Sequence, residues 1–232
     1  MTKIEKLKKW IEEAKTLVVF TGAGISCPSG IPDFRSQKDR SFERILTYRY
    51  MEENNDEFTR YIFSKLYHKE AKPNICHNYL TKLEKSGKLT QLVTQNIDDL
   101  HQMSGMKKVY PLHGSIHEWY CMKCDRKYNV DLLNKEMANY CSCGGFIRPN
   151  VVLYGEPLDE AYYHLGLVAC QVADTLVVIG SSLNVNPAAS MIKYYAGSRL
   201  VIINKDKTKY DLRADLVIHK DIEEVIKELE RL

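Results

Sequence analysis

The chain has 232 residues, of which 44% are hydrophobic and 27% charged, and its formal net charge is +3. These values are ordinary for a globular protein and exclude the collagen-like, disordered and coiled-coil classes. The near balance of charge argues against a protein whose main role is to coat nucleic acid or an anionic membrane. No apolar run reaches about 18 residues and the N-terminus lacks the apolar stretch of a signal peptide, so we expect a cytoplasmic protein.

Hydrophobic periodicity predicts helices that alternate with short apolar strands. In chain order we expect a helix over 3–15, a strand over 17–20, a loop with one or two helices over 36–74, a helix over 77–83, a strand over 89–94, an inserted module over 116–150, a strand over 151–153, a helix over 159–172, a strand over 175–179, a helix over 187–195, strands over 200–203 and 216–218, and a last helix capped by Asp221. This order predicts an α/β fold with a mainly parallel sheet covered on both faces.

A glycine-rich turn follows the first predicted strand. Gly22-Ala23-Gly24 suits a phosphate group, because glycines let the backbone come close and exposed amides at a helix start attract anions. The full dinucleotide pattern has a third glycine at position 27, where this chain has Cys27. An ordinary tight turn therefore remains the alternative.

The segment after this turn reads as a shaped loop. Two prolines and a glycine within residues 28–32 interrupt the regular helix that a dehydrogenase-type unit would have here. The loop carries an acid, an aromatic ring and a guanidinium side by side in Asp33-Phe34-Arg35, a combination that is untypical of a core. A solvated loop remains the alternative.

Polar residues also follow the second long strand. Gln95-Asn96-Ile97-Asp98 comes at the carboxyl end of that strand, which is where ligands bind in open parallel sheets, although a helix cap would use the same residue types. His113 is the candidate proton acceptor, because the unperturbed pKa of histidine lies near neutrality. A structural histidine is the alternative.

Two close cysteine pairs predict a metal site. Cys121 and Cys124 are separated by 16 residues, 125–140, from Cys141 and Cys143. This spacing indicates a tetrahedral four-thiolate zinc site, which is closed to substrate and therefore structural. A redox role would need one reactive pair rather than two matched pairs. A nucleic-acid-binding ribbon is disfavoured because the basic residues here are few and mixed with acids.

Taken together, seven motifs in one order resemble those of the sirtuins, the NAD-dependent protein deacylases, and of the bacterial type in particular. They are residues 22–26, 29–35, 94–98, 113–115, the four cysteines, 154–156, and 180–183 before Pro187. The resemblance implies a Rossmann-like NAD-binding domain formed by residues 1–35, 75–117 and 150–232. It also implies that residues 36–74 form a cofactor loop and the helical part of a small domain, and that residues 118–149 form a zinc-binding module.

The same resemblance implies that NAD is bound and consumed as a co-substrate. Phe34, Ile97 and Asp98 would form the nicotinamide pocket, while Gln95 and Asn204 would bind ribose hydroxyls. The residues expected to contact NAD are Gly22, Ala23, Gly24, Cys27, Asp33, Phe34, Arg35, Gln95, Asn96, Ile97, Asp98, His113, Gly180, Ser181, Ser182, Asn204, Lys205 and Ile222.

The reaction that the resemblance implies is lysine deacylation. The acyl-lysine amide oxygen would attack the ribose C1′ and displace nicotinamide, giving free lysine and O-acyl-ADP-ribose. His113 would act as general base on a ribose hydroxyl, and Asn96 would orient that ribose or a water molecule. An extended acyl-lysine peptide would pair with two flanking segments, at Val152, Tyr154, Gly155, Glu156, Asn184 and Val185.

Three departures from the family pattern bear on these expectations. The stretch after Arg35 lacks the usual glycine, so we expect a shorter or differently ordered cofactor loop. Asp99 stands where the family often has glycine. In the sirtuins that prefer succinyl groups, a tyrosine and an arginine three residues later bind the acyl carboxylate. Here Ser64 stands three residues after Tyr61, so we expect acetyl or longer neutral acyl groups over succinyl. An ADP-ribosyltransferase on the same scaffold remains open because it uses the same electrophile, whereas Cys27 and the proline-rich loop disfavour a hydride-transferring dehydrogenase.

Overall fold

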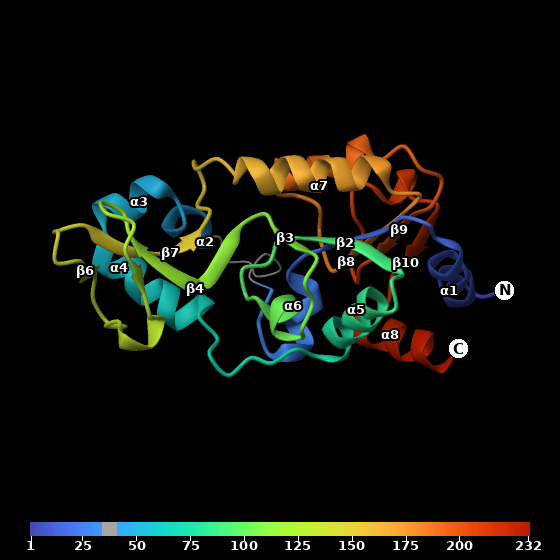
Figure 1. Cartoon of the computed structure of the whole chain (residues 1–232), viewed down its shortest axis with the longest axis horizontal. Coiled ribbons are helices and arrows are strands. Elements are labelled where there is room, and N and C mark those ends of the chain that lie inside the picture. The colour runs from blue at the N-terminus through green and yellow to red at the C-terminus, as the bar shows by residue number, and fades with distance from the viewer. Residues whose placement is uncertain (34–40) are drawn as a thin grey trace.

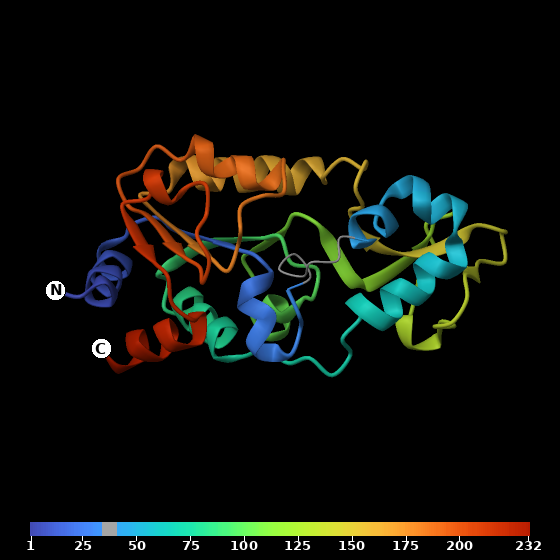
Figure 2. The same cartoon turned by 180° about the vertical axis from the view of Figure 1, so that it is seen from behind.

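The computed structural model describes residues 1–33 and 41–232. The molecule has a larger lobe built on a parallel sheet and a smaller lobe built on an antiparallel sheet (Figure 1). Both chain termini lie at the far end of the larger lobe (Figure 2). None of the helices within the described ranges is long and apolar enough to cross a membrane.

The larger lobe contains a six-stranded sheet in which every neighbouring pair is parallel. Its strands lie in the order β10 (Leu216–Ile218), β9 (Leu200–Ile203), β8 (Thr175–Ile179), β1 (Leu17–Thr21), β2 (Leu89–Thr94) and β3 (Val109–Pro111). From β1 the chain builds outward through β2 to β3, and it later returns to build β8, β9 and β10 on the other side. The predicted parallel sheet is confirmed, and its strand order reverses between β1 and β8.

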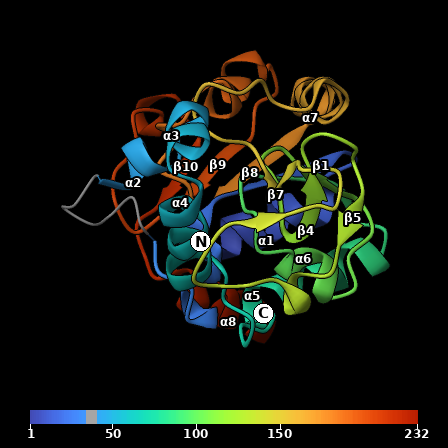
Figure 3. The same cartoon turned by 90° about the vertical axis from the view of Figure 1, so that its left-hand side faces the viewer.

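Helices cover both faces of this sheet, as expected. On one face lie α1 (Lys3–Glu13), α5 (Ile75–Lys85) and α8 (Ile222–Arg231), and on the other lie α7 (Glu160–Val172) and the 3₁₀ helix η5 (Ala188–Tyr194). Figure 3 shows α7 and α8 on opposite sides. Alternate residues of β1 supply the two cores, since Leu17 and Val19 belong to the first and Val18 and Phe20 to the second.

The predicted helix boundaries rest on identifiable caps. Thr2 and Glu5 form a capping box at the start of α1. The Asp221 carboxylate accepts the amide hydrogens of Glu223 and Glu224, at 2.9 and 3.4 Å, and so caps α8 as expected.

The smaller lobe brings together two chain segments that are far apart in the sequence. The first contributes α2 (Ser41–Ile45), α3 (Tyr48–Glu53), α4 (Asn55–Tyr61) and the π-helix η3 (Ile62–Leu66), and the second contributes the sheet β5 (Lys127–Tyr128), β4 (Gly114–Cys121), β7 (Phe146–Val151), β6 (Asn139–Tyr140) and the 3₁₀ helix η4 (Val130–Leu132). Phe58 and Ile62 pack with Trp119 and Phe146 in one core. The helical segment and the cysteine-bearing segment therefore form a single packed unit.

Several elements differ from the sequence expectations. The strand expected over 151–153 is wrong, because β7 ends at Val151 and residues 152 and 153 have no strand partner among the described residues, although the Val152 amide still donates to the His113 carbonyl (3.0 Å). The helix expected over 187–195 is 3₁₀ rather than α. Where a loop was expected after β1, the chain forms the 3₁₀ helix η1 (Ala23–Ser29). The short helices α6 (Leu100–Met103) and η6 (Asp211–Arg213) were not anticipated.

Strand β4 connects the two lobes. Its first residues pair with the end of β7, at Gly114↔Val151 and Ser115↔Asn150, and its last residues pair with the start of β7. The register shifts between Ser115 and Trp119, which is how a strand bends within a ladder. The smaller lobe is thus attached to the larger one through a bent two-stranded ladder.

Candidate active site

Three neighbouring strands end at one edge of the parallel sheet, and the candidate motifs follow each of them. Thr21, the last residue of β1, lies beside Ile179 of β8 and Thr94 of β2. Gly22, Gly180 and Gln95 therefore come next along this edge. Because the strand order reverses here, this is where a doubly wound sheet binds its ligand.

The glycines at this edge are required by close backbone packing. A Cβ on Gly24 would lie 2.8 Å from the Gly180 Cα, and one on Gly22 would lie 2.8 Å from the Gly180 carbonyl oxygen. Gly180 itself has a φ of +64°, a conformation that favours glycine. The amides of Gly22 and Gly24 donate to the carbonyls of Ile179 and Gly180. These two hydrogen bonds hold the turn after β1 against the end of β8.

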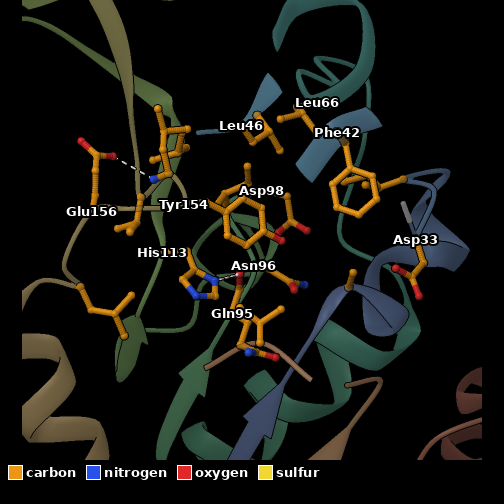
Figure 4. Close-up of a pocket in the computed structure, with 18 of the residues that line it drawn as sticks. Asp33, Phe42, Leu46, Leu66, Gln95, Asn96, Asp98, His113, Tyr154 and Glu156 are labelled. Carbon is orange, nitrogen blue, oxygen red and sulfur yellow. Dashed lines mark hydrogen bonds between the residues drawn. The ribbon is translucent and has the colours of Figure 1, made fainter. Parts of the chain in front are cut away.

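A cavity of about 250 Å³ lies between this edge and the smaller lobe. Figure 4 shows His113, Asn96, Asp98 and Tyr154 around it. The predicted site residues that line it are Ala23, Asp33, Gln95, Asn96, Ile97, Asp98, His113, Val152, Tyr154, Gly155, Glu156 and Val185. The structure thus gathers residues from five separate sequence motifs around one space.

The carboxylate of Asp98 is held by the surrounding backbone and by Ser26. It accepts the Ser26 hydroxyl at 2.6 Å and the Leu100 amide at 3.0 Å. The Asn96 amide group donates to the same Ser26 hydroxyl oxygen at 3.1 Å. Burial raises the pKa of Asp98, and the hydrogen bond from Ser26 opposes that rise. The result is a fixed acceptor at the cavity wall.

His113 lies in the turn between β3 and β4. Its Nδ1 is 2.7 Å from the carbonyl oxygen of Gln95. A carbonyl only accepts, so Nδ1 carries the hydrogen and the neutral ring has its lone pair on Nε2. Gly114 follows with a φ of +76°, and a Cβ there would collide with the Asn150 carbonyl oxygen. The turn that presents the imidazole therefore needs this glycine.

Gln95 has a side-chain donor that the described residues leave without an acceptor. Its Oε1 accepts the Ser181 hydroxyl at 2.7 Å, which links the loops after β2 and β8. Its Nε2 is buried and has no hydrogen-bond partner within the described part of the chain. A buried unpaired donor at a cavity wall is unfavourable unless a ligand supplies an acceptor. This group fits the ribose hydroxyl or another oxygen of a nucleotide.

The other predicted NAD contacts lie along the sheet edge and outside this cavity. They are Gly22, Gly24, Cys27, Gly180, Ser181, Ser182, Asn204, Lys205 and Ile222. Burial, followed by the charge of Asp33, raises the pKa of Cys27, while Lys205 lowers it slightly. Cys27, Asp33 and Lys205 therefore share one neighbourhood, beside the start of α8. Phe34 and Arg35, also predicted to contact NAD, lie outside the described residues.

The predicted peptide-binding segment joins the two lobes. The Tyr154 amide donates to the Leu46 carbonyl at 2.9 Å, and the Tyr48 amide donates to the Tyr154 carbonyl at 3.1 Å. Val185, from the opposite flank, lines the same cavity, whereas Asn184 does not. Residues of both flanks thus line one space.

The four predicted metal ligands come together at the far end of the smaller lobe. The sulfur atoms of Cys121, Cys124, Cys141 and Cys143 all lie within 4.8 Å of one another. A tetrahedral zinc ion with bonds of about 2.3 Å places its sulfurs about 3.8 Å apart. A Cβ on Gly145 would lie 2.5 Å from the Cys121 sulfur, so glycine leaves room for this cluster. The residues fit a closed, structural zinc site.

Some cavity residues were not identified from the sequence. Ser26, Ile31 and Pro32 lie within a quoted motif but carry no charge that would have singled them out. Phe42, Leu46 and Leu66 come from the weakly periodic helical segment. Their apolar side chains have no pattern that distinguishes a cavity lining from a core.

The chain was compared with known proteins. The model of the Sir2 family matches residues 22–187. A protein of Clostridium acetobutylicum called NAD-dependent protein deacetylase is 43% identical, with 97% of each chain covered, and one of Staphylococcus aureus with the same name is 42% identical with the same coverage.

Solved structures are similar over nearly the whole chain. A Sir2 structure described with a p53 peptide and NAD+ has a TM-score of 0.90 and 35% identity, covering 99% of this chain and 97% of that one. A Sir2 structure described with a deacetylated p53 peptide and 3′-O-acetyl-ADP-ribose has a TM-score of 0.92, 35% identity and the same coverage.

Proposed function

The chain belongs to the Sir2 family, and we propose that it is an NAD-dependent protein deacetylase that acts on acyl-lysine side chains. The observation that carries this proposal is the shared cavity, in which His113, Asn96 and Asp98 face the peptide-binding segment at Val152 and Tyr154. A dinucleotide at the sheet edge and an acyl-lysine between the lobes would meet in this cavity. The name of the bacterial relatives and the ligands of the solved Sir2 structures support the same activity.

NAD supplies the sugar carbon that the acyl-lysine amide oxygen attacks as nicotinamide leaves. The Asp98 carboxylate, fixed by Ser26, accepts the amide hydrogens of the nicotinamide group. Gln95 offers its unused Nε2 hydrogen to a ribose hydroxyl. The turn at Ala23 and the loop at Ser181 lie along the sheet edge where the diphosphate is held.

His113 is the general base in this proposal. Its Nδ1 hydrogen is bound to the Gln95 carbonyl, so the lone pair on Nε2 is the group that takes a proton from a ribose hydroxyl. That hydroxyl then attacks the acyl carbon, the C–N bond to lysine breaks as the amine takes the proton from His113, and one water molecule adds to the remaining acyl–ribose adduct, giving free lysine and O-acyl-ADP-ribose. Asn96, held on Ser26 beside this imidazole, orients the ribose or a water molecule.

The acyl group is neutral in this proposal. Among the residues that the structure describes, no lysine or arginine lines the cavity, while Phe42, Leu46 and Leu66 do. A succinyl carboxylate in such surroundings would lose its hydration without gaining a counter-charge. This supports acetyl or a longer neutral acyl group.

A cytoplasmic location is also proposed, because thiolates that hold zinc persist in a reducing compartment.

The test is turnover of an acetyl-lysine peptide with NAD. We expect nicotinamide and O-acetyl-ADP-ribose in equal amounts by mass spectrometry. His113→Ala should lower kcat by about 10²- to 10⁴-fold, the usual contribution of general base catalysis, and leave NAD binding by calorimetry unchanged. The control is His164→Ala, since His164 is exposed on α7. If His113→Ala still transfers labelled ADP-ribose to protein at the rate of the wild type, the chain is a transferase instead.

A further inference from the structure

One ion pair, between a buried arginine and a partly buried glutamate, lies outside the catalytic steps described above. The Arg148 side chain, from β7, is only 2% exposed, and it binds the Glu156 carboxylate through two nitrogens, at 2.6 and 2.9 Å. Such a two-point contact fixes the relative orientation of both groups. Arg148 does not line the cavity, whereas Glu156 lies at its rim (Figure 4).

The remaining hydrogen bonds of this pair go to the chain between its two members. Arg148 also donates to the carbonyl oxygens of Val151 at 2.6 Å and Pro149 at 3.2 Å. Glu156 accepts the amide hydrogen of Leu153 at 2.8 Å. The ion pair therefore closes a loop in the chain and uses backbone groups within that loop to do so.

The closed loop is the wall of the cavity. All six residues from 151 to 156 line it, and we call them the wall segment. Val151 is the last residue of β7, and residues 152–156 of the wall segment lie beyond the β ladder. Its position is instead held by the ion pair and by the contacts of Val152 with His113 and of Tyr154 with Leu46. Without the ion pair, the wall segment would keep these backbone contacts but would lose the side-chain hydrogen bonds to Val151 and Leu153.

We propose that Arg148 is a positioning residue which, through Glu156, holds the wall segment in the shape that binds the acyl-lysine peptide. Glu156 then contributes to substrate binding through the backbone it fixes and not through a contact with the peptide. This inference rests on the proposed deacetylase function and adds the group that sets its peptide site. Burying a charged pair is unfavourable unless its geometry is well satisfied, and here both partners are satisfied by the wall segment.

The test separates peptide affinity from NAD affinity. Arg148→Lys keeps the charge but loses the two-point contact, and Glu156→Gln keeps the shape but loses the charge. Each should raise the KM for an acetyl-lysine peptide about tenfold or more and leave the KM for NAD within about twofold, since about 1.4 kcal/mol of lost positioning is a factor of ten. The peptide KM of the double variant should be no higher than that of the single variant with the higher KM, because both changes remove the same contact.

The matched control is Lys69→Met, which removes an exposed ion pair with Asp131 in the same lobe, at 2.7 Å. It should leave both KM values within twofold. A second measurement does not depend on catalysis. The amide hydrogen of Leu153 should exchange at least tenfold faster in Glu156→Gln, while that of Val93 in β2 should not change.

Two results would overturn the inference. One is a peptide KM within twofold of the wild type in folded Arg148→Lys and Glu156→Gln proteins. The other is an equal rise in both KM values, which would mean a general loss of structure. If Arg148→Lys does not fold, Glu156→Gln and the Leu153 exchange rate decide. Failure of the proposed function is distinct, because the wild type itself would then neither bind a fluorescent acetyl-lysine peptide nor release nicotinamide.

Discussion

At the scale of single residues, Asp99 combines an unfavourable backbone with a favourable side chain. Its φ is +56°, in the left-handed region that favours glycine, which is the residue that sirtuins often have at this position. Its carboxylate accepts the Ser115 hydroxyl, two residues after His113. Asp99 therefore links the loop that holds Asp98 to the loop that holds the imidazole.

Two variants measure how much the left-handed backbone conformation at Asp99 costs in stability. Asp99→Ala and Asp99→Gly both remove the carboxylate, but only alanine keeps a Cβ in the left-handed conformation. We expect Asp99→Ala to be less stable than Asp99→Gly by about 1 kcal/mol, the lower end of the range for such a residue. Urea unfolding checks this, and equal stability would show that the backbone at position 99 relaxes.

Single residues also show what the sequence could reveal about the site. His113, Asn96 and Asp98 were predictable because charged or polar groups after buried strands have few structural uses. Val152 and Tyr154 were predicted through the family resemblance. Phe42 and Leu66 were not predictable, because only the three-dimensional fold brings their helices against the sheet edge. Ser26 was missed because a serine in a turn is common in any loop.

At the scale of elements, two buried histidines join α5 and α6 to the central strand. The rings of His77 and His101 lie 4.8 Å apart, and His101 Nε2 is 3.0 Å from the Thr21 hydroxyl. Both side chains are buried. Burial lowers the pKa of His77 to about 4, and it holds the pKa of His101 well below its usual value. Both histidines are therefore neutral when the protein is folded.

This pair predicts a loss of stability in mild acid. The folded pKa of His77 is below its unfolded value of about 6.5, so the unfolded chain takes up the proton first as the pH falls. The contribution of neutral His77 to the free energy of unfolding is fully present above about pH 6.5 and is lost progressively down to about pH 4. The wild type should lose about 3 kcal/mol more over this range than His77→Gln. Denaturant unfolding at several pH values measures the difference, and parallel curves would contradict it.

The elements that the sequence predicted are those with a strong local signal. The strands over 17–20 and 175–179 are almost wholly apolar, the strand over 89–94 carries Leu89, Leu92 and Val93 among polar residues, and the structure confirms all three. The strand predicted over 151–153 was wrong because Val152 and Leu153 are residue types typical of strands, whereas the Leu153 amide donates to the Glu156 carboxylate and not to a neighbouring strand. The helix η1 was not predicted, because Pro28 lies inside it and the prolines and glycine of residues 28–32 favoured a loop.

At the scale of the whole molecule, the metal site supports the lobe that contributes half of the cavity. The small sheet has two strands of only two residues each, β5 and β6. Cys121 and Cys141 are buried members of the lobe's core with Trp119 and Phe146. A lobe with so little sheet depends on its metal for stability.

Zinc removal should therefore unfold the smaller lobe and leave the larger one folded. Cys141→Ser or treatment with a strong chelator should lower the zinc content and abolish deacetylation, and heating should then show two separate transitions. The buried Cys170, in α7 of the larger lobe, provides the control, since Cys170→Ala should keep its zinc. Full activity in a protein shown by atomic absorption to contain no zinc would contradict the assignment.

The bent ladder of β4 and β7 has a consequence for how this architecture can be altered. One strand begins beside His113, the proposed general base, and the other ends at Val151, where the wall segment starts. The metal-binding lobe therefore cannot be exchanged without changing the cavity. A chimera that receives this lobe from a relative also receives that relative's share of the cavity lining. Peptide preference and metal content should therefore change together in such a chimera, whereas NAD binding should remain that of the recipient.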